Sequence, residues 1–266
     1  MTPVNRIDDK FKALRSEGRK AFIAYVTAGD PDLAATKALA LGLEASGVDI
    51  LELGIPFSDP IADGPTIQEA SYRALAGKVT LKKIFAMARD LRSVTDIPIV
   101  FMTYYNPVLR YGLKEFFVSC CKCGVDGVIV PDLPFEEAVD LTALAKRYAV
   151  AAIFLAAPTS TPDRIKAIAR ISKGFIYYVS LTGVTGARRE LPKDISSKIK
   201  AIISVTDKPI AVGFGVSRAL QAAQIARMAD GVIVGSAIVK IISEKKNIMP
   251  RVFAFAKGLA KAIHEA

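Results

Sequence analysis

Cysteine and histidine are scarce in this sequence of 266 residues, which holds three cysteines and one histidine. The cysteines crowd together at Cys120, Cys121 and Cys123, too close to bridge one another easily, and we expect reduced structural thiols. The single histidine, His264, lies near the C-terminus, so the sequence has no Cys/His cluster with zinc-ligand spacing. These shortages disfavour a disulfide-stabilised fold and a zinc site.

Long hydrophobic runs are also lacking, although 52% of the residues are hydrophobic. No apolar run approaches the roughly 18 residues that span a bilayer, and acids at Asp8 and Asp9 stand where a signal peptide would begin its apolar core. The formal charge of +10 is dispersed, aromatic residues make up only 8%, and no nucleic-acid recognition motif is present. We therefore expect a cytoplasmic protein without a membrane or nucleic-acid partner, whose basic surface assists anionic substrates.

Eight short apolar or β-branched runs have the character of buried parallel strands, and amphipathic helical segments separate them. Eight such units in one chain of this length predict a single (β/α)₈ barrel domain over residues 1–266, of the TIM-barrel class. A doubly wound sheet is the alternative, because it shares the alternation of strands and helices. The expected strands lie near residues 20–26, 48–53, 97–103, 125–130, 150–156, 175–180, 209–213 and 231–235.

Two of the expected units are longer than the others. They follow the second strand, over residues 54–96, and the sixth, over residues 181–208. Loops that follow barrel strands build the active site in this fold, so the extra chain lies on the functional face. The segment before residue 18 adds a helix that we expect to plug the base of the barrel, and Asp30 with the following proline is a helix start signal.

Two carboxylates stand at the end of the second expected strand. Glu52 lies between Leu51 and Leu53 in an apolar run, and Asp63 follows in the loop. A carboxylate buried in a strand costs several kcal/mol, so Glu52 needs a function or a partner. A structural salt bridge for Glu52, and capping by Asp63 of the helix that begins near Gly64, are the alternatives to a catalytic pair.

Glycines follow the last two expected strands, at Gly213 and Gly215 and at Gly235, where Ser236 comes next. Barrels often bind phosphate with backbone N–H groups after strands seven and eight, so these glycines predict a phosphate site. Residues 183–189, with paired glycines about Thr185, resemble a lid.

Cleavage of a carbon–carbon bond beside a sugar phosphate usually uses a Schiff-base lysine or a divalent metal in barrels. No lysine stands at an expected strand end, and no metal-ligand cluster is present, so both routes are disfavoured. Acid–base chemistry by Glu52 and Asp63 remains.

The sequence resembles the tryptophan synthase alpha subunit family over nearly its whole length. The segment Leu51-Glu-Leu-Gly-Ile-Pro-Phe-Ser-Asp-Pro-Ile-Ala-Asp-Gly-Pro-Thr-Ile-Gln is similar to the family's most diagnostic motif. Further similar segments follow in family order at residues 130–134, 183–186, 213–215 and 235–239, and residues 26–31 precede them.

The resemblance implies a lyase that splits indole-3-glycerol phosphate into indole and glyceraldehyde 3-phosphate without a cofactor or metal on this chain. It places Glu52 on the proton-transferring glutamate and Asp63 on the aspartate that binds the indole N–H. The substrate-binding positions that it implies are Tyr25, Ile67, Met102, Ile129, Tyr177, Thr185, Gly186, Gly213, Phe214, Gly215, Gly235 and Ser236. Tyr25 departs from the family pattern, because many members have Phe there, and its hydroxyl must find a partner.

The resemblance also implies a partner, a pyridoxal-phosphate-dependent beta subunit that receives indole in an α₂β₂ complex. Pro56 and Asp59 fall on positions that face this partner, in the loop that bears Asp63. A stand-alone lyase of the same chemistry and a non-catalytic regulatory subunit that docks the beta subunit are the alternatives.

Overall fold

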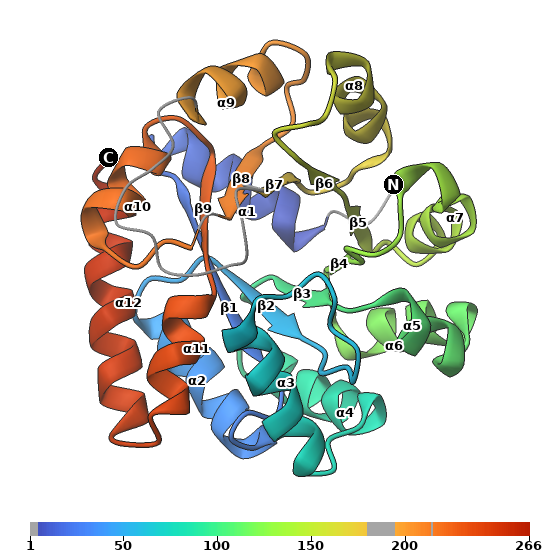
Figure 1. Cartoon of the computed structure of the whole chain (residues 1–266), viewed down its shortest axis with the longest axis vertical. Helices are drawn as coiled ribbons and strands as arrows, with labels where there is room; N and C mark the ends of the chain where they lie inside the picture. The colour runs from blue at the N-terminus through green and yellow to red at the C-terminus, as the bar shows by residue number, and fades with distance from the viewer. Residues whose placement is uncertain (1–4, 180–194, 214) are drawn as a thin grey trace.

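The computed structural model describes residues 5–179, 195–213 and 215–266, and its strands form a ring that helices surround (Figure 1). All paired strands are parallel. Each expected strand is present within about two residues of its expected bounds. The strands are β1 Ala21–Thr27, β2 Ile50–Gly54, β3 Ile99–Met102, β4 Gly127–Ile129, β5 Ala151–Ile153, β6 Leu155–Ala156, β7 Ile176–Val179, β8 Ile210–Gly213 and β9 Gly231–Val234.

The fifth expected strand is divided at Phe154 into β5 and β6. The sheet order β5-β4-β3-β2-β1-β9-β8-β7-β6 therefore starts and ends on the same stretch of chain. The first half pairs with β4 and the second half with β7. Because the order returns to its starting strand, the sheet is a closed barrel and the doubly wound alternative is wrong.

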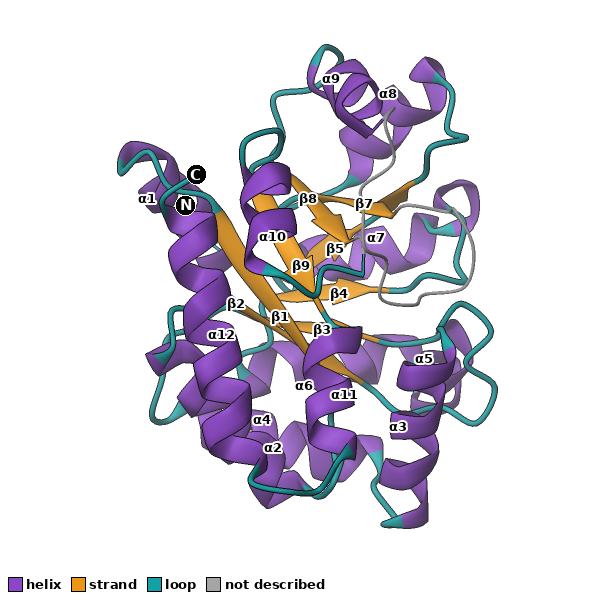
Figure 2. Ribbon diagram, turned by 60° about the vertical axis from the view of Figure 1, so that its left-hand side comes forward, coloured by secondary structure: helices purple, strands orange, loops and turns teal. Residues whose placement is uncertain are grey.

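The described residues form twelve α-helices, of which α2–α12 cover the outside of this barrel (Figure 2). Second helices follow β2, β3 and β9, which places additional chain at the carboxyl ends of these strands. The helices are α1 Arg6–Ser16, α2 Leu33–Ala45, α3 Pro65–Ala76, α4 Leu81–Arg92, α5 Tyr105–Tyr111, α6 Leu113–Cys123, α7 Val139–Arg147, α8 Pro162–Ile171, α9 Ile195–Ile203, α10 Ala219–Ala226, α11 Ser236–Ser243 and α12 Ile248–His264; η1 is a 3₁₀ turn at Phe135–Glu137.

The N-terminal helix α1 closes the base of the barrel, as expected. Its side chains Ile7, Phe11 and Leu14 are buried in one cluster with inward-facing residues of the strands, among them Ile23 and Ile233. This apolar face is the reason that α1 packs beneath the strands and does not lie on the outside with the other helices.

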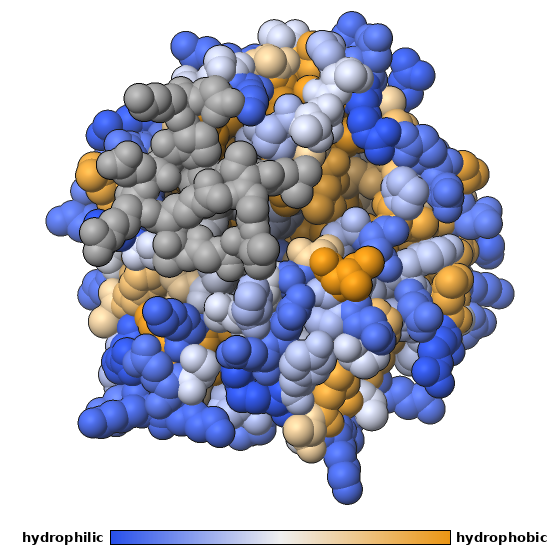
Figure 3. Space-filling view, in the orientation of Figure 1, coloured by the Kyte–Doolittle hydropathy of each residue, from blue (hydrophilic) through white to orange (hydrophobic). Residues whose placement is uncertain are grey.

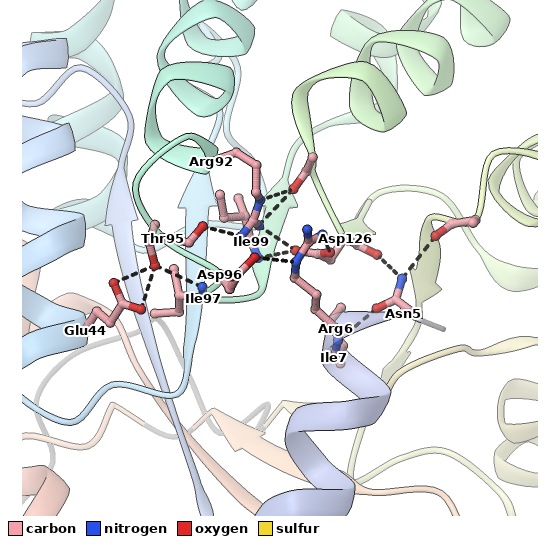
Figure 4. Close-up of polar contacts among 12 residues, drawn as sticks. Asn5, Arg6, Ile7, Glu44, Arg92, Thr95, Asp96, Ile97, Ile99 and Asp126 are labelled. Carbon is pink, nitrogen blue, oxygen red and sulfur yellow. Dashed lines mark hydrogen bonds and ion pairs between the residues drawn. The ribbon is translucent and has the colours of Figure 1, made fainter. Parts of the chain in front are cut away.

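A polar cluster beneath β3 and β4 fixes α1 in place (Figure 4). Asp126, 5% exposed, accepts hydrogen bonds from Arg6 at 3.1 Å, from Arg92 at 2.9 Å and from the Ile99 N–H at 2.8 Å. The Asn5 side chain donates to the Asp126 carbonyl at 2.7 Å. We call Asp126 and Arg92 the base ion pair; it lies at the amino ends of the strands.

The helix start expected at Asp30 lies two residues later. Asp32 caps α2, because its side chain accepts the Ala35 N–H at 2.7 Å. Asp30 is 3% exposed and pairs with Arg73 of α3. An arginine distant in the sequence therefore binds the first acid and leaves the second to cap the helix.

The surface is predominantly hydrophilic around the helical rim, with apolar residues in smaller patches between (Figure 3). No helix of the described residues is both long enough and apolar enough to cross a membrane. The three cysteines are free thiols, with Cys120 buried and Cys121 exposed.

Candidate active site

Glu52 is a buried acid without a partner among the described residues. It lies in the middle of β2, between Tyr25 of β1 and Val100 of β3 in the sheet register. Its side chain is 1% exposed, and neither carboxylate oxygen has a hydrogen-bond partner within the described chain. The salt bridge considered from the sequence is therefore not formed there. An acid in this position is held in its neutral form.

Burial raises the pKa of Glu52 from 4.5 to about 8, and the nearby charge of Asp63 acts in the same direction. A carboxylic acid with this pKa is mostly protonated at neutral pH, so it can donate a proton. Its deprotonated form is then a stronger base than an ordinary carboxylate.

Asp63 lies in the loop between β2 and α3, and three contacts fix its place. The Tyr104 hydroxyl donates to Asp63 Oδ2 at 3.0 Å and accepts the Ala62 N–H at 2.9 Å, and the Gln68 amide donates to the Asp63 carbonyl at 2.8 Å. Gly64 is the N-cap of α3 and no side chain caps this helix, so the capping alternative for Asp63 is wrong.

The pKa of Asp63 is raised from 3.8 to about 6, because burial outweighs the hydrogen bond from Tyr104, which lowers it. At neutral pH Asp63 is therefore mostly ionised while Glu52 is mostly protonated. We call Glu52 and Asp63 the acid pair: two carboxyl groups whose surroundings hold them in opposite protonation states.

Tyr104 and Gln68 are contacts of Asp63 that the sequence analysis missed. Tyr104 contacts Asp63 across 41 residues of sequence, a separation at which no periodicity predicts contact. One signal was available, because Tyr104 is the second residue after β3 and so stands at the carboxyl end of a barrel strand.

Apolar side chains from four elements, β1, β3, α3 and α11, form a cluster near the acid pair. Tyr25, Ile67 and Met102 share one cluster with Ala70 of α3 and Val239 of α11. The Tyr25 hydroxyl finds its partner in Thr27 Oγ1, 3.3 Å away. The sequence analysis predicted Tyr25, Ile67 and Met102 for this cluster and did not predict Ala70 or Val239.

Met102 also packs against the barrel-interior cluster, which contains Ile129 and borders Tyr177 and Leu155. Met102 and Ile129 are neighbours in the β3–β4 register. Burial raises the pKa of Tyr177, and the charges of Glu52 and Asp63 raise it further. Tyr177 is thus near the acid pair, whereas Ile129 forms the apolar floor behind Met102.

The glycines predicted for phosphate lie at the ends of neighbouring strands. Gly213 ends β8, Gly215 has φ +57°, and Gly235 precedes α11, whose first residue is Ser236. α11 begins at the second residue after β9, so its N-terminus lies at the carboxyl end of the barrel, and no side chain caps its first N–H groups. Such a helix start can bind an anion. Thr185, Gly186 and Phe214 lie outside the described residues.

The two expected partner positions differ in exposure. Asp59 is exposed and accepts a hydrogen bond from Ser58, whereas Pro56 is buried. In the same loop Ile61 is 83% exposed. In this conformation Asp59 can touch another protein directly and Pro56 can only shape the loop.

The described residues contain no group of three or more His, Cys, Asp or Glu side chains placed to hold a metal ion.

Comparisons with a family profile, with similar sequences and with solved structures all identify the same family. A sequence profile of the tryptophan synthase alpha chain family matches residues 11–264. The tryptophan synthase alpha chain of Geobacter sulfurreducens is 50% identical over 262 residues, which are 98% of this chain and 99% of that protein. The alpha chain of Thermoanaerobacter sp. strain X514 is 45% identical over 263 residues, 98% of this chain and all of that protein.

Solved structures agree with the sequence comparison. A chain of Mycobacterium tuberculosis tryptophan synthase superposes with a TM-score of 0.91 at 41% identity, covering 98% of this chain and 99% of that one. Tryptophan synthase subunit alpha from Legionella pneumophila gives a TM-score of 0.91 at 36% identity, with 98% of each chain covered. This protein therefore belongs to the tryptophan synthase alpha chain family.

Proposed function

We propose that this alpha chain cleaves indole-3-glycerol phosphate to indole and glyceraldehyde 3-phosphate, with the acid pair as its catalytic groups. One observation carries the proposal: Glu52 is buried and unpaired within the described chain, beside an Asp63 that the Tyr104 hydroxyl binds. A fold keeps so costly an acid where a reaction uses it.

The reaction begins with proton transfer from neutral Glu52 to C3 of the indole ring, while ionised Asp63 accepts a hydrogen bond from the ring N–H. The ring then carries the positive charge of an indolenine, which Asp63 stabilises. Glu52, now a carboxylate, takes the proton of the hydroxyl on the side-chain carbon attached to C3. The bond between that carbon and C3 breaks, its electron pair returns to the ring, and an aldehyde forms. Glu52 ends protonated, as it began.

Binding of the substrate uses the two kinds of surface beside the acid pair. Tyr25, Ile67 and Met102 enclose the indole ring, with Ile129 behind them, and Tyr177 lies against the side chain of the substrate. The N–H groups near Gly213, Gly215, Gly235 and Ser236 bind the phosphate. On the family resemblance, Phe214, Gly186 and Thr185 are further substrate-binding positions of this proposal.

The partner in the proposal is the beta subunit of tryptophan synthase, which holds pyridoxal phosphate and receives the indole in a cytoplasmic α₂β₂ complex. This chain itself uses no cofactor. Asp59 contacts the beta subunit, and Pro56 shapes the contacting loop from beneath. The same loop ends in Asp63, so docking and catalysis are coupled.

Indole release from indole-3-glycerol phosphate tests this proposal. The substrate also carries an indole ring, so the released indole is separated from it by extraction before it is measured. We expect Glu52→Gln to lower kcat at least ~100-fold, since acid–base groups contribute ~10²–10⁴-fold. The exposed Glu137→Gln serves as the control and should keep the wild-type rate. Normal indole production by Glu52→Gln would refute the mechanism.

Adding a purified beta subunit separates the remaining alternatives. A rate that rises on addition supports the coupled alpha subunit, and an unchanged rate supports a stand-alone lyase. A chain that binds the beta subunit but forms no indole is a regulatory subunit.

A further inference from the structure

The ion pair between Asp30 and Arg73 lies apart from the acid pair but on the same end of the barrel. Arg73 Nε donates to Asp30 Oδ1 at 2.9 Å, and a terminal nitrogen of Arg73 donates to Oδ2 at 2.7 Å. Asp30 is 3% exposed and the Arg73 side chain 26%. Two parallel hydrogen bonds between a planar guanidinium and a carboxylate fix both distance and angle.

Asp30 is held by the turn that ends β1. Its N–H donates to the Thr27 carbonyl at 3.2 Å, and the N–H of Gly29 donates to Thr36 Oγ1 at 2.9 Å. Gly29 has φ +90° and leaves no room for a Cβ against Val79. The carboxylate of Asp30 therefore belongs to a rigid part of the barrel rim.

Arg73 stands on the helix that follows the catalytic loop. Ile67, Ala70 and Arg73 are three residues apart in α3, so they project from neighbouring positions of one helix side. Ile67 and Ala70 pack in the cluster of Tyr25. Arg73, one turn further along the helix, binds Asp30. One side of α3 thus touches the substrate-enclosing cluster and the end of β1 together.

The start of α3 is tied to the catalytic loop, because the Gln68 amide of α3 donates to the Asp63 carbonyl at 2.8 Å. Its N-cap is Gly64, with no side-chain cap hydrogen bond, and Asp63 directly precedes that cap. A shift of the helix therefore moves the acid of the catalytic loop with it. A displacement of 1 Å in an active site can lower a rate ~100-fold.

We propose that Asp30 and Arg73 are positioning residues that hold α3, and through it Asp63 and Ile67, in the geometry that cleavage requires. Neither side chain needs to touch the substrate. The inference rests on the catalytic role proposed for Asp63. Lysine in place of Arg73 keeps the charge but provides a single ammonium group, so the angular constraint on α3 is lost.

The base ion pair supplies a matched control. Arg92 and Asp126 are also buried, at 12% and 5% exposure, and also join through a 2.9 Å hydrogen bond. Asp126 directly precedes β4, so this pair lies at the amino ends of the strands, whereas Asp63 follows the carboxyl end of β2. An Arg→Lys change there disturbs a buried ion pair without moving α3.

The experiment compares Arg73→Lys with Arg92→Lys in the full chain bound to a beta subunit. Urea unfolding gives the loss of stability, and the rate of formation of extracted indole gives kcat and KM. We expect Arg73→Lys to lower kcat at least ~10-fold, beyond any loss in folded protein, and Arg92→Lys to keep kcat per folded molecule within ~2-fold. Asp30→Asn should resemble Arg73→Lys.

Asp63→Asn in the same assay distinguishes the two proposals. If Asp63→Asn keeps the wild-type rate, the catalytic role of Asp63 is wrong. If Asp63→Asn is impaired while Arg73→Lys and Asp30→Asn keep the wild-type kcat, only the positioning role is overturned. Equal losses of kcat in Arg73→Lys and Arg92→Lys also overturn it, because the effect is then one of stability.

Discussion

Replacing Glu52 by glutamine should make the fold less sensitive to alkaline pH, at the expense of activity. The pKa of this acid rises from an ordinary 4.5 to about 8 in the fold. A raised pKa means that the protonated acid is the form that the fold favours. The contribution of Glu52 to stability is therefore fully present below pH 4.5 and is lost as the pH rises toward 8.

The size of this effect follows from the two pKa values. Each pH unit between them costs ~1.4 kcal/mol, because the unfolded chain ionises Glu52 while the folded chain keeps it neutral. The loss amounts to ~3 kcal/mol at pH 7 and to ~5 kcal/mol above pH 8. Glutamine has nearly the same shape and no charge, so Glu52→Gln does not lose this free energy of unfolding as the pH rises. Its unpaired amide adds a penalty of ~1–3 kcal/mol that does not change with pH.

The assay is urea unfolding followed by far-ultraviolet circular dichroism at several pH values between 5 and 8.5. The free energy of unfolding of Glu52→Gln, relative to the wild type, should rise by ~3 kcal/mol between pH 5 and pH 7.5. The exposed Asp207→Asn is the charge-matched control, and its curve should run parallel to that of the wild type. Parallel curves for Glu52→Gln as well would refute the reasoning, because Glu52 would then not be buried as an unpaired acid.

Three further predictions concern other parts of the chain. The pH dependence of kcat/KM should be bell-shaped with limbs near 6 and 8, since Asp63 must be ionised and Glu52 protonated. The Tyr104→Phe change removes a hydrogen bond that lowers the pKa of Asp63. This variant should therefore have its acidic limb at higher pH. Gly54→Ala should lower kcat/KM at least ~10-fold, because a Cβ there would lie 2.0 Å from the Tyr25 hydroxyl. Asp126→Asn should lower the free energy of unfolding by ~3–5 kcal/mol, as expected for a broken buried ion pair, with kcat per folded molecule unchanged.

Each of these has a result that would contradict it. An acidic limb that stays in place in Tyr104→Phe would mean that the hydroxyl does not bind Asp63 in solution. For the glycine, Gly258→Ala is the control, because a Cβ there meets nothing within 4 Å; equal kinetics for both variants would be inconsistent with the close approach of Tyr25. A lower kcat per folded molecule in Asp126→Asn would contradict the third prediction, because the base of the barrel would then influence the catalytic groups.

The strands were predictable because each is buried on both faces, so each appears in the sequence as a short, nearly continuous apolar run. Glu52 was predictable for the same reason, because it is a carboxylate that lies between two leucines of such a run. The division at Phe154 was not, because the run from residue 150 to residue 156 is apolar throughout and only the change of neighbour from β4 to β7 interrupts it.

Contacts between distant side chains were the other part that the sequence could not provide. Tyr104 and Arg73 are an ordinary tyrosine and an ordinary helix arginine in the sequence, and their roles depend on which acid the fold brings to them. The position of the α2 cap was wrong for this reason: Asp30 and Asp32 are equivalent as capping residues until Arg73 binds one of them.

The helix beneath the barrel determines how molecules can travel through it. Ile7, Phe11 and Leu14 of α1 fill the axis at the base with apolar side chains. A molecule on the barrel axis therefore has no route downward and must enter and leave by the carboxyl-end mouth. Both products share that one opening with the incoming substrate, so an element that covers the opening controls when each molecule enters or leaves. A protein seated there would receive the product directly, before it reaches bulk water.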